Sequence, residues 1–134
     1  MSQLYDSAKE NFLSAQVNMT ADTIIAIPLS ASYSFSASAH KFISDLTGIV
    51  ARSTGLTGKS VSAGVFDAND QLILTVTGST VTQIALCKDV GDDATSPLIA
   101  LVNSGTGLPI VPDGSNLLIT WDNGANKIFR LTEP

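Results

Sequence analysis

The feature that most constrains this fold is a pair of unbroken apolar runs between Val81 and Val102, separated by one polar, acidic connection. Residues 84–87 and 98–102 do not alternate with polar residues as a half-exposed strand would, so we expect strands with both faces covered. The connection, residues 89–97, combines turn formers, three aspartates and a proline, which excludes an interior strand. These runs predict a buried central hairpin with an exposed turn.

The size and composition fit one domain, residues 1–134, with a weakly charged surface. Charged residues make up only 14% of the chain, against about 25% in ordinary soluble domains. Such a surface is typical of a domain covered by neighbouring subunits or proteins, and the composition fits a weakly charged monomer about equally well. The net charge of −5 and the scattered basic residues argue against direct contact with nucleic acid, because phosphate binding requires clustered Lys and Arg.

The cysteine content and the N-terminal sequence indicate where in the cell the protein is expected to be made. Cys87 is the only cysteine, so an internal disulfide is excluded, and it lies in an apolar run where a thiol behaves as a small hydrophobic group. No run approaches the roughly 18 apolar residues of a membrane helix. The first ten residues lack the basic start and the apolar stretch of a signal peptide. We therefore expect cytoplasmic synthesis and no membrane association.

Two short helices are predicted in the first half of the chain. Residues 1–16 read as an amphipathic helix with Ser2 as a candidate cap, packed on an edge of the β-domain or, alternatively, against another subunit. Its apolar residues recur at helical spacing: Leu4, Ala8, Phe12 and Ala15. A second helix of one or two turns is expected over Ala39–Leu46, capped by Ser38 and ended by Gly48.

The segment between these helices predicts one strand and one ambiguous stretch. Thr23–Leu29 is expected to be the first strand, and Pro28, which lacks a backbone donor, indicates either an edge position or the end of the strand. The serine-rich stretch Ser30–Ser38, with Tyr33 and Phe35 on alternate positions, fits either a short strand or an ordered loop.

Two further hairpins are predicted in the second half. Val65–Ala68 and Leu72–Val76 flank a polar connection of hairpin length. Leu117–Trp121 and Lys127–Leu131 are expected to pair across a tight turn at Asn123-Gly124. We expect Trp121 and Phe129 to approach one another across that turn and to be buried.

The remaining segments predict broken strands and one long loop. Residues 49–63 are cut by glycines into short extended pieces. Residues 103–116 form an ordered loop that Leu108, Ile110 and Val111 are expected to pin to the body. Regular turn signals without βαβ alternation therefore predict a mainly β fold, an antiparallel β-sandwich or jelly-roll-like domain with the two short helices.

The only histidine, His40, is the first candidate for catalysis. A Ser-His-Asp site would recruit Asp45 and one of the serines, but no Gly-x-Ser-x-Gly motif surrounds any serine. We interpret His40 as a partly exposed residue at the start of the short helix and expect no enzymatic activity.

Two acidic groups are candidates for calcium: Asp89, Asp92 and Asp93, and Asp67, Asn69 and Asp70. Neither group is followed by the glycine and glutamate of a calcium loop, so we interpret both as turn residues and predict no metal and no cofactor. Gly105–Gly107 and Thr57–Ser60 contain only fragments of a phosphate-binding loop and are interpreted as turns.

Three aromatic residues offer two interpretations. Tyr5, Tyr33 and Trp121 would form a recognition platform for carbohydrate or protein if they were exposed. Trp121 closes an apolar strand, which favours a core position.

Several short motifs have a distinctive residue sequence. In the second half they are Ala94–Leu101, Thr106–Pro109, Pro112–Gly114 and Ile119–Leu131, and in the first half Tyr33–Lys41, Leu56–Val61 and Gly64–Ala68. With the short opening helix, these motifs resemble a family of small structural proteins encoded by tailed bacteriophages and prophages. The resemblance covers nearly the whole chain.

This resemblance implies a virion protein. Compact β-rich domains of this size commonly decorate or cement the head lattice, so we expect a capsid decoration or cement protein. The expected partners are the major capsid protein or other virion structural proteins, together with further copies of this chain. The alternatives are a tail, neck or fibre-associated protein and a host-surface carbohydrate-binding module.

Overall fold

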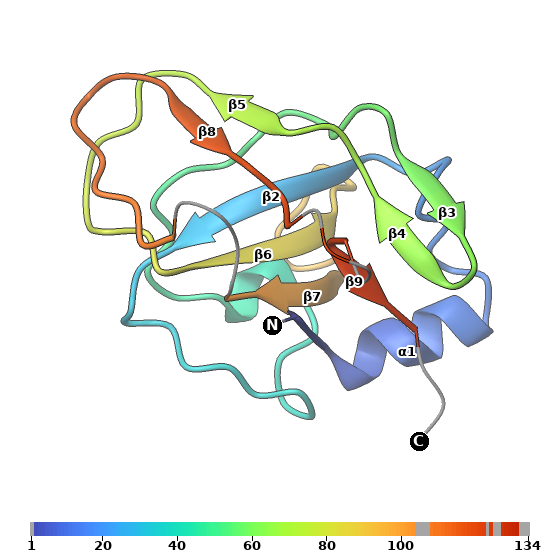
Figure 1. Cartoon of the computed structure of the whole chain (residues 1–134). Helices are drawn as coiled ribbons and strands as arrows, with labels where there is room; N and C mark the ends of the chain where they lie inside the picture. Colours follow the sequence, from blue (N-terminus) through green and yellow to red (C-terminus); the bar gives the residue numbers. More distant parts are fainter. Residues whose placement is uncertain (1, 104–107, 123, 125–126, 132–134) are drawn as a thin grey trace.

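The computed structural model describes residues 2–103, 108–122, 124 and 127–131, which form a mainly β fold (Figure 1). Its elements are β1 (Ser2–Leu4), α1 (Asp6–Leu13), β2 (Ile24–Leu29), the 3₁₀ turn η1 (Ile43–Asp45), β3 (Ser60–Ser62), β4 (Val65–Asp67), β5 (Gln71–Ile73), β6 (Gln83–Lys88), β7 (Leu98–Val102), β8 (Leu117–Ile119) and β9 (Phe129–Arg130). Three antiparallel sheets result, with strand orders β1-β7-β6-β2, β3-β4-β9 and β5-β8. The predicted fold class is confirmed.

The predicted central hairpin is β6–β7, in the middle of the four-stranded sheet. Ile84 pairs with Val102 and Leu86 with Ala100, and a bulge leaves Ile99 without a partner on β6. All of β7 and the four inner residues of β6 are buried, as two covered faces require. In the connection, residues 89–95 are exposed as predicted, but Pro97 is half-buried and Ser96 is buried, because its hydroxyl accepts the Val90 N–H at 3.1 Å across the turn.

The four-stranded sheet is the middle layer of a sandwich-like arrangement. The small sheets β3-β4-β9 and β5-β8 lie over one face, and α1 and the segment 30–46 lie over the other (Figure 1). The first face packs in a core that includes Ile24, Leu86, Ile99, Phe66, Ile119 and Phe129. The opposite face packs in a second core that includes Ile25, Leu29, Cys87, Tyr5, Ala8 and Ile43.

The predicted edge position of Pro28 is confirmed, because β2 is the last strand of its sheet. The amide positions of Ala26 and Pro28 face away from β6, so the N–H that proline lacks is not needed for the ladder. The irregular segment 48–56 covers this edge: the Val50 N–H donates to the Pro28 carbonyl, and the Ser53 hydroxyl accepts from the Ala26 N–H at 2.8 Å. Unpaired edge groups are thereby satisfied.

The N-terminal helix is shorter than predicted. Residues 2–4 form the edge strand β1, paired with β7, and α1 begins only at Asp6 with Tyr5 at its N-cap. Ser2 is therefore not the cap. The helix packs through Ala8 over one face of the four-stranded sheet rather than on an edge as predicted. The prediction of a helix over residues 1–16 failed because Leu4 suits the strand register as well as the helical one.

The two other predicted hairpins are wrong in their pairing. β4 pairs with β3 and β9, whereas β5 pairs with β8, so neither β4–β5 nor β8–β9 is a hairpin. The hairpin formed locally is β3–β4, which turns through Ala63 and Gly64 with φ values of 52° and 78°. Two central residues with positive φ are what a type I′ turn requires. Most of the proposed Asn123-Gly124 turn lies outside the described residues.

The structure also tests the predictions for the segments 30–38 and 39–46. The segment 30–38 is a loop rather than a strand, and the predicted helix over Ala39–Leu46 is reduced to η1. Ser38 does not cap it; instead Asp45 Oδ2 accepts the N–H groups of Lys41 at 2.8 Å and Phe42 at 3.0 Å.

The loop 108–116 contacts the body of the domain only in part. Ile110 pairs with Val81, but Val111 is exposed.

The predicted burial of two aromatic residues is confirmed. Trp121 and Phe129 both lie in the first core, although the segments that carry them do not pair with each other. None of the helices in the described part of the chain has the length and apolar character to cross a bilayer.

Candidate functional site

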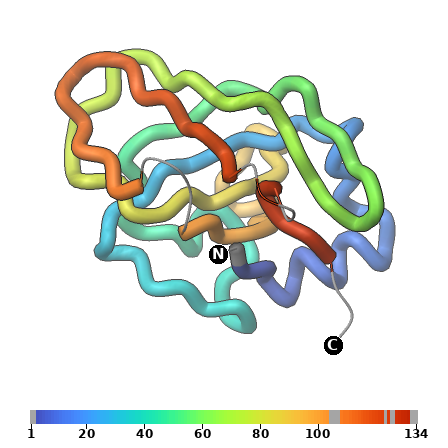
Figure 2. The backbone as a smooth tube through the Cα atoms, viewed as in Figure 1, coloured from blue at the N-terminus to red at the C-terminus, as the bar shows by residue number. Residues whose placement is uncertain are grey.

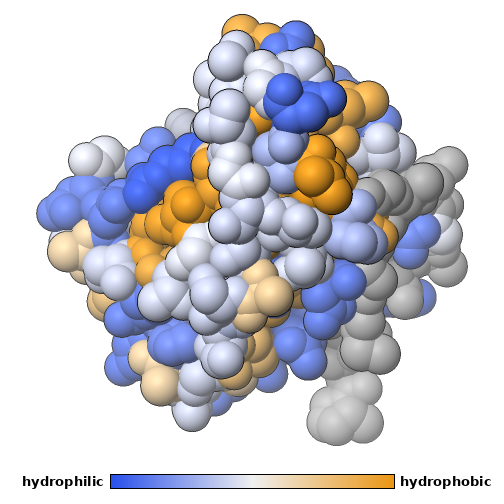
Figure 3. Space-filling view, turned by 90° about the vertical axis from the view of Figure 1, so that its left-hand side faces the viewer, coloured by the Kyte–Doolittle hydropathy of each residue, from blue (hydrophilic) through white to orange (hydrophobic). Residues whose placement is uncertain are grey.

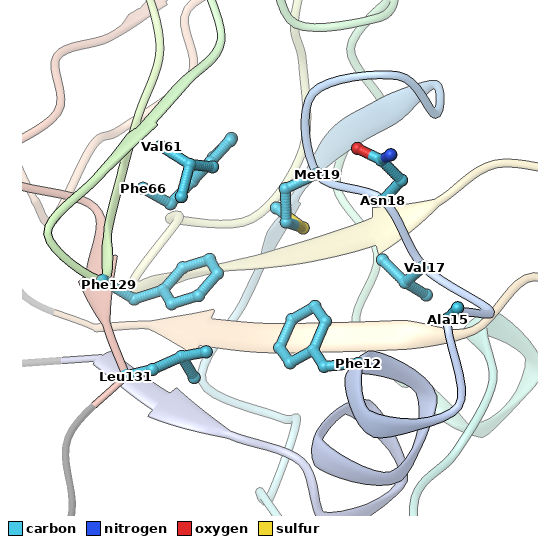
Figure 4. Close-up of a pocket in the computed structure, with 10 residues that line it drawn as sticks. Phe12, Ala15, Val17, Asn18, Met19, Val61, Phe66, Phe129 and Leu131 are labelled. Carbon is cyan, nitrogen blue, oxygen red and sulfur yellow. The ribbon is translucent and has the colours of Figure 1, made fainter.

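An apolar groove of about 390 Å³ lies between the C-terminal end of α1 and the sheet β3-β4-β9. Figure 4 shows its walls, with Phe12 of α1 and Phe129 of β9 on opposite sides. Their ring centroids are 6.4 Å apart, and the two ring planes are nearly parallel, with an angle of 18° between them. The lining is mostly apolar: Phe12, Val17, Met19, Phe66, Phe129 and Leu131. Its volume lies within the range of about 300–1,000 Å³ typical of binding pockets.

One wall of the groove is held by a set of polar contacts. Lys88 Nζ donates to the Gln16 carbonyl at 2.9 Å and lies 3.2 Å from Asp22 Oδ2. Lys59 Nζ donates to the Asp22 carbonyl, and Asp22 Oδ2 also accepts the Asn18 N–H at 2.8 Å. That backbone hydrogen bond is the main reason why the pKa of Asp22 is lowered. These contacts fix residues 16–22, so the groove is preformed.

The most exposed apolar side chain at this end of the molecule is Leu13, which is 90% exposed. It is the last residue of α1 and directly follows Phe12, which lines the groove. Across the groove, Val61 is 56% and Leu131 48% exposed.

A second exposed apolar surface lies on the outer side of the β5–β8 pair, and we call Leu72, Leu74 and Leu118 the leucine face. Leu72 and Leu118 are directly opposite on adjacent strands, and Leu74 follows on the same side. Their exposures are 48%, 68% and 53%. The residues between them, such as Ile73 and Ile119, point into the first core. A two-residue period thus leaves the leucines outside.

The surrounding surface is polar but weakly charged. Figure 3 shows one side of the molecule, where residues of near-neutral hydropathy predominate and apolar residues reach the surface in several places. This matches a sequence in which 14% of residues are charged.

His40 belongs to a chain of three polar rings that the sequence did not predict. Tyr33 Oη lies 2.8 Å from His40 Nδ1 and 2.7 Å from Tyr5 Oη. Burial raises the pKa values of both tyrosines, so both stay protonated and neutral. The carboxylate of Asp45 is held by backbone N–H groups instead. The structure therefore does not bring His40, Asp45 and a serine together as a catalytic triad.

Each carboxylate of the acidic connection has its own local partner. Asp93 accepts two hydrogen bonds from Arg52, at 2.7 and 2.6 Å, which lowers the pKa of that carboxyl. Asp89 and Asp92 accept the N–H groups of Gly91 and Ala94. In the described part of the chain, no group of three His, Cys, Asp or Glu side chains is arranged to hold a metal ion.

The other acidic group is also engaged in structural contacts. Asp70 Oδ1 accepts the Trp121 N–H at 3.1 Å, and Asp67 Oδ1 accepts the Ala68 N–H. The segment Thr57–Ser60 bends at Gly58, which has a φ of 63°, and enters β3 at Ser60. Gly105–Gly107 lies outside the described residues.

The aromatic residues considered as a recognition platform are buried. Tyr5, Tyr33 and Trp121 are 0%, 4% and 5% exposed. The indole Nε1 of Trp121 donates to the Asn69 carbonyl at 3.0 Å. The core interpretation of Trp121 is confirmed, and a carbohydrate platform built from these three rings is excluded.

No protein-family model matches this chain, and a search of curated proteins finds no similar sequence.

Proposed function

We propose that this protein is a structural component of a tailed-bacteriophage virion that decorates or cements the head lattice through its leucine face. The motifs between Ala94 and Leu131, which resemble small phage structural proteins, support a place in the virion. The leucine face is the observation that supports docking, because three leucines about half exposed or more lie on one side of a sheet. Contiguous exposed apolar side chains are typical of protein interfaces.

The charges near the leucine face favour a partner other than a second copy. The segments 68–78 and 111–122, which carry these leucines, contain Asp70, Asp113 and Asp122 but no Lys or Arg. Two copies would bring these carboxylates together, whereas a surface with basic residues around an apolar centre would complement them. The proposed partner is therefore the major capsid protein or another virion protein with such a surface.

Particle composition tests this function. Particles of the encoding phage are purified, and the protein is quantified by mass spectrometry against the major capsid protein. A decoration protein will be present at a copy number comparable to that of the major capsid protein. A small fixed copy number would instead support a tail, neck or fibre position, and absence from purified particles would overturn the virion assignment.

A further inference from the structure

A second hollow, of about 280 Å³, opens where α1 and the residues before η1 meet the end of the β6–β7 hairpin. We call it the polar hollow; Asn11, Phe42 and Thr95 are among its lining residues. Its lining combines exposed apolar side chains with amide and hydroxyl groups. We infer that the polar hollow binds one neutral sugar ring of a glycan.

The apolar part of the polar hollow is preformed by backbone pairing. Phe42 and Pro97 are an antiparallel pair, and one hydrogen bond on each side of the pair, at 3.0 and 2.9 Å, holds the two segments together. In a pair with this hydrogen-bond pattern the two side chains lie close to each other. Phe42 is 36% and the nearby lining residue Val90 is 49% exposed. The C–H face of a sugar ring is apolar and packs on such a surface.

The polar part offers hydrogen-bonding groups that the protein leaves unused. In the part of the chain that the structure describes, no hydrogen bond engages the side-chain amide of Asn11. Gln16 donates through Nε2 to the Ser14 carbonyl at 3.5 Å, which leaves its own Oε1 free. The Thr95 hydroxyl donates to the Asp92 carbonyl at 3.4 Å and keeps its acceptor capacity. An amide presents a donor and an acceptor side by side, which matches the neighbouring hydroxyl groups of a sugar.

The charges around the polar hollow favour a neutral ligand. Among the described lining residues Lys88 is the charged one, and its Nζ is already held by the Gln16 carbonyl at 2.9 Å and by Asp22 Oδ2 at 3.2 Å. An anionic ligand would have to compete with Asp22 for this ammonium group. The connection 89–97, which supplies part of the lining, carries three aspartates that would repel an anion.

The polar hollow and the leucine face lie in opposite layers of the molecule. Asn11 and Phe42 belong to the layer formed by α1 and the segment 30–46, whereas the leucine face is on the outer side of the β5–β8 pair (Figure 1). A copy docked through the leucine face would therefore leave the polar hollow open to a glycan. Sugar binding is a property of the isolated chain and does not depend on the proposed function.

Two-dimensional amide NMR spectra of the isolated full chain test the inference. The protein is titrated separately with the methyl glycosides of glucose, galactose, mannose, rhamnose and N-acetylglucosamine. At least one of these sugars will shift the amide signals of residues 41–43 and 88–96 in a saturable manner. An absence of saturable shifts with every sugar of the panel would overturn the inference, and so would shifts confined to other segments.

Variants of the lining then assign the contacts. Phe42→Ala will weaken binding of the active sugar by about tenfold or more, because it removes the apolar surface, whereas Phe42→Tyr keeps a ring and will retain binding. Asn11→Ala will weaken binding by about two- to tenfold. Leu72→Ala is the matched control, since it shortens an exposed side chain of the leucine face, and it will leave the affinity unchanged.

The amide spectrum of each variant reports its folding, so a lost contact is distinguished from an unfolded chain. If folded Phe42→Ala and Asn11→Ala both bound the sugar as wild type does, the sugar would occupy another site and the polar hollow would be excluded.

Discussion

Replacement of Trp121 by alanine is the perturbation whose cost follows most directly from the structure. Trp121 is 5% exposed in the core between the four-stranded sheet and the small sheets. Removing a buried ring of this size costs about 3 to 5 kcal/mol. Its indole N–H also holds the Asn69 carbonyl at 3.0 Å, and loss of such a bond costs about 0.5 to 1.5 kcal/mol.

These terms are large compared with the stability of a whole domain, about 5 to 15 kcal/mol. At this chain length, 1 kcal/mol corresponds to roughly 3 to 5 °C in Tm, so we expect Trp121→Ala to melt at least 10 °C below wild type by this rough conversion. Trp121→Phe keeps the six-membered part of the ring but loses the rest of the indole together with the hydrogen bond, so its cost should lie between that of the bond alone and that of Trp121→Ala.

The assay is thermal and urea unfolding followed by circular dichroism. Leu118→Ala is the control on the neighbouring strand β8, because this leucine is 53% exposed, and its cost should stay near 0.5 kcal/mol. If Trp121→Ala melted with wild type, or if Leu118→Ala cost as much as Trp121→Ala, the assignment of Trp121 to the core would be refuted.

Three further predictions concern single residues. Cys87 is fully buried and its thiol pKa is raised by burial, so a thiol reagent should label it only in the unfolded chain, and rapid native labelling would contradict its core position. The pKa of Asp45 is lowered by the Lys41 and Phe42 N–H groups. Its contribution to stability is therefore complete above the unfolded value of about 4 and is lost as the pH falls through the folded value. The difference in unfolding free energy between wild type and Asp45→Ala should be constant near neutral pH and shrink below about pH 4, and a difference that grows in acid would refute this reasoning. Ala63 has a φ of 52° in the β3–β4 turn, so Ala63→Asn, which tolerates that conformation, should stabilise the protein by a few tenths to about 1 kcal/mol in urea unfolding, and a loss of stability would contradict the type I′ turn.

The central layer was predictable because its signal is local and strong. Two continuous apolar runs indicate strands with both faces buried, and the residues between them cannot lie in a core. Pro28 indicated the edge strand for an equally local reason. Regular turn signals without βαβ alternation then favoured an antiparallel arrangement, which the structure confirms.

The pairing of the small sheets was not predictable from local signals. β4, β5, β8 and β9 have only two or three residues each, too few for their patterns to specify a partner. Turn-forming residues at Asn69 and Asn123 suggested pairing with the nearest neighbour along the chain. The structure instead pairs β5 with β8 and β4 with β9, and the route of the chain between them is visible in Figure 2.

The candidate surfaces escaped sequence reasoning for the same reason. The groove is assembled from the end of α1, the β3–β4 hairpin and β9, so no local motif marks it. Leu118 stood inside an apparently continuous apolar run, and its exposure follows only from the register with Leu72. A two-residue alternation over residues 71–74 was the one available signal for the leucine face.

The most direct test of the account is an add-back experiment on phage particles that lack this protein. Purified wild-type protein should bind these particles to saturation, and so should Leu13→Ser, which changes an exposed leucine outside the leucine face. The double variant Leu72→Ser and Leu118→Ser should keep a cooperative melting transition but lose binding, because it removes the apolar centre of the leucine face. Equal binding of the folded double variant and wild type would contradict docking through the leucine face, and no binding of wild-type protein would contradict a role on the particle surface.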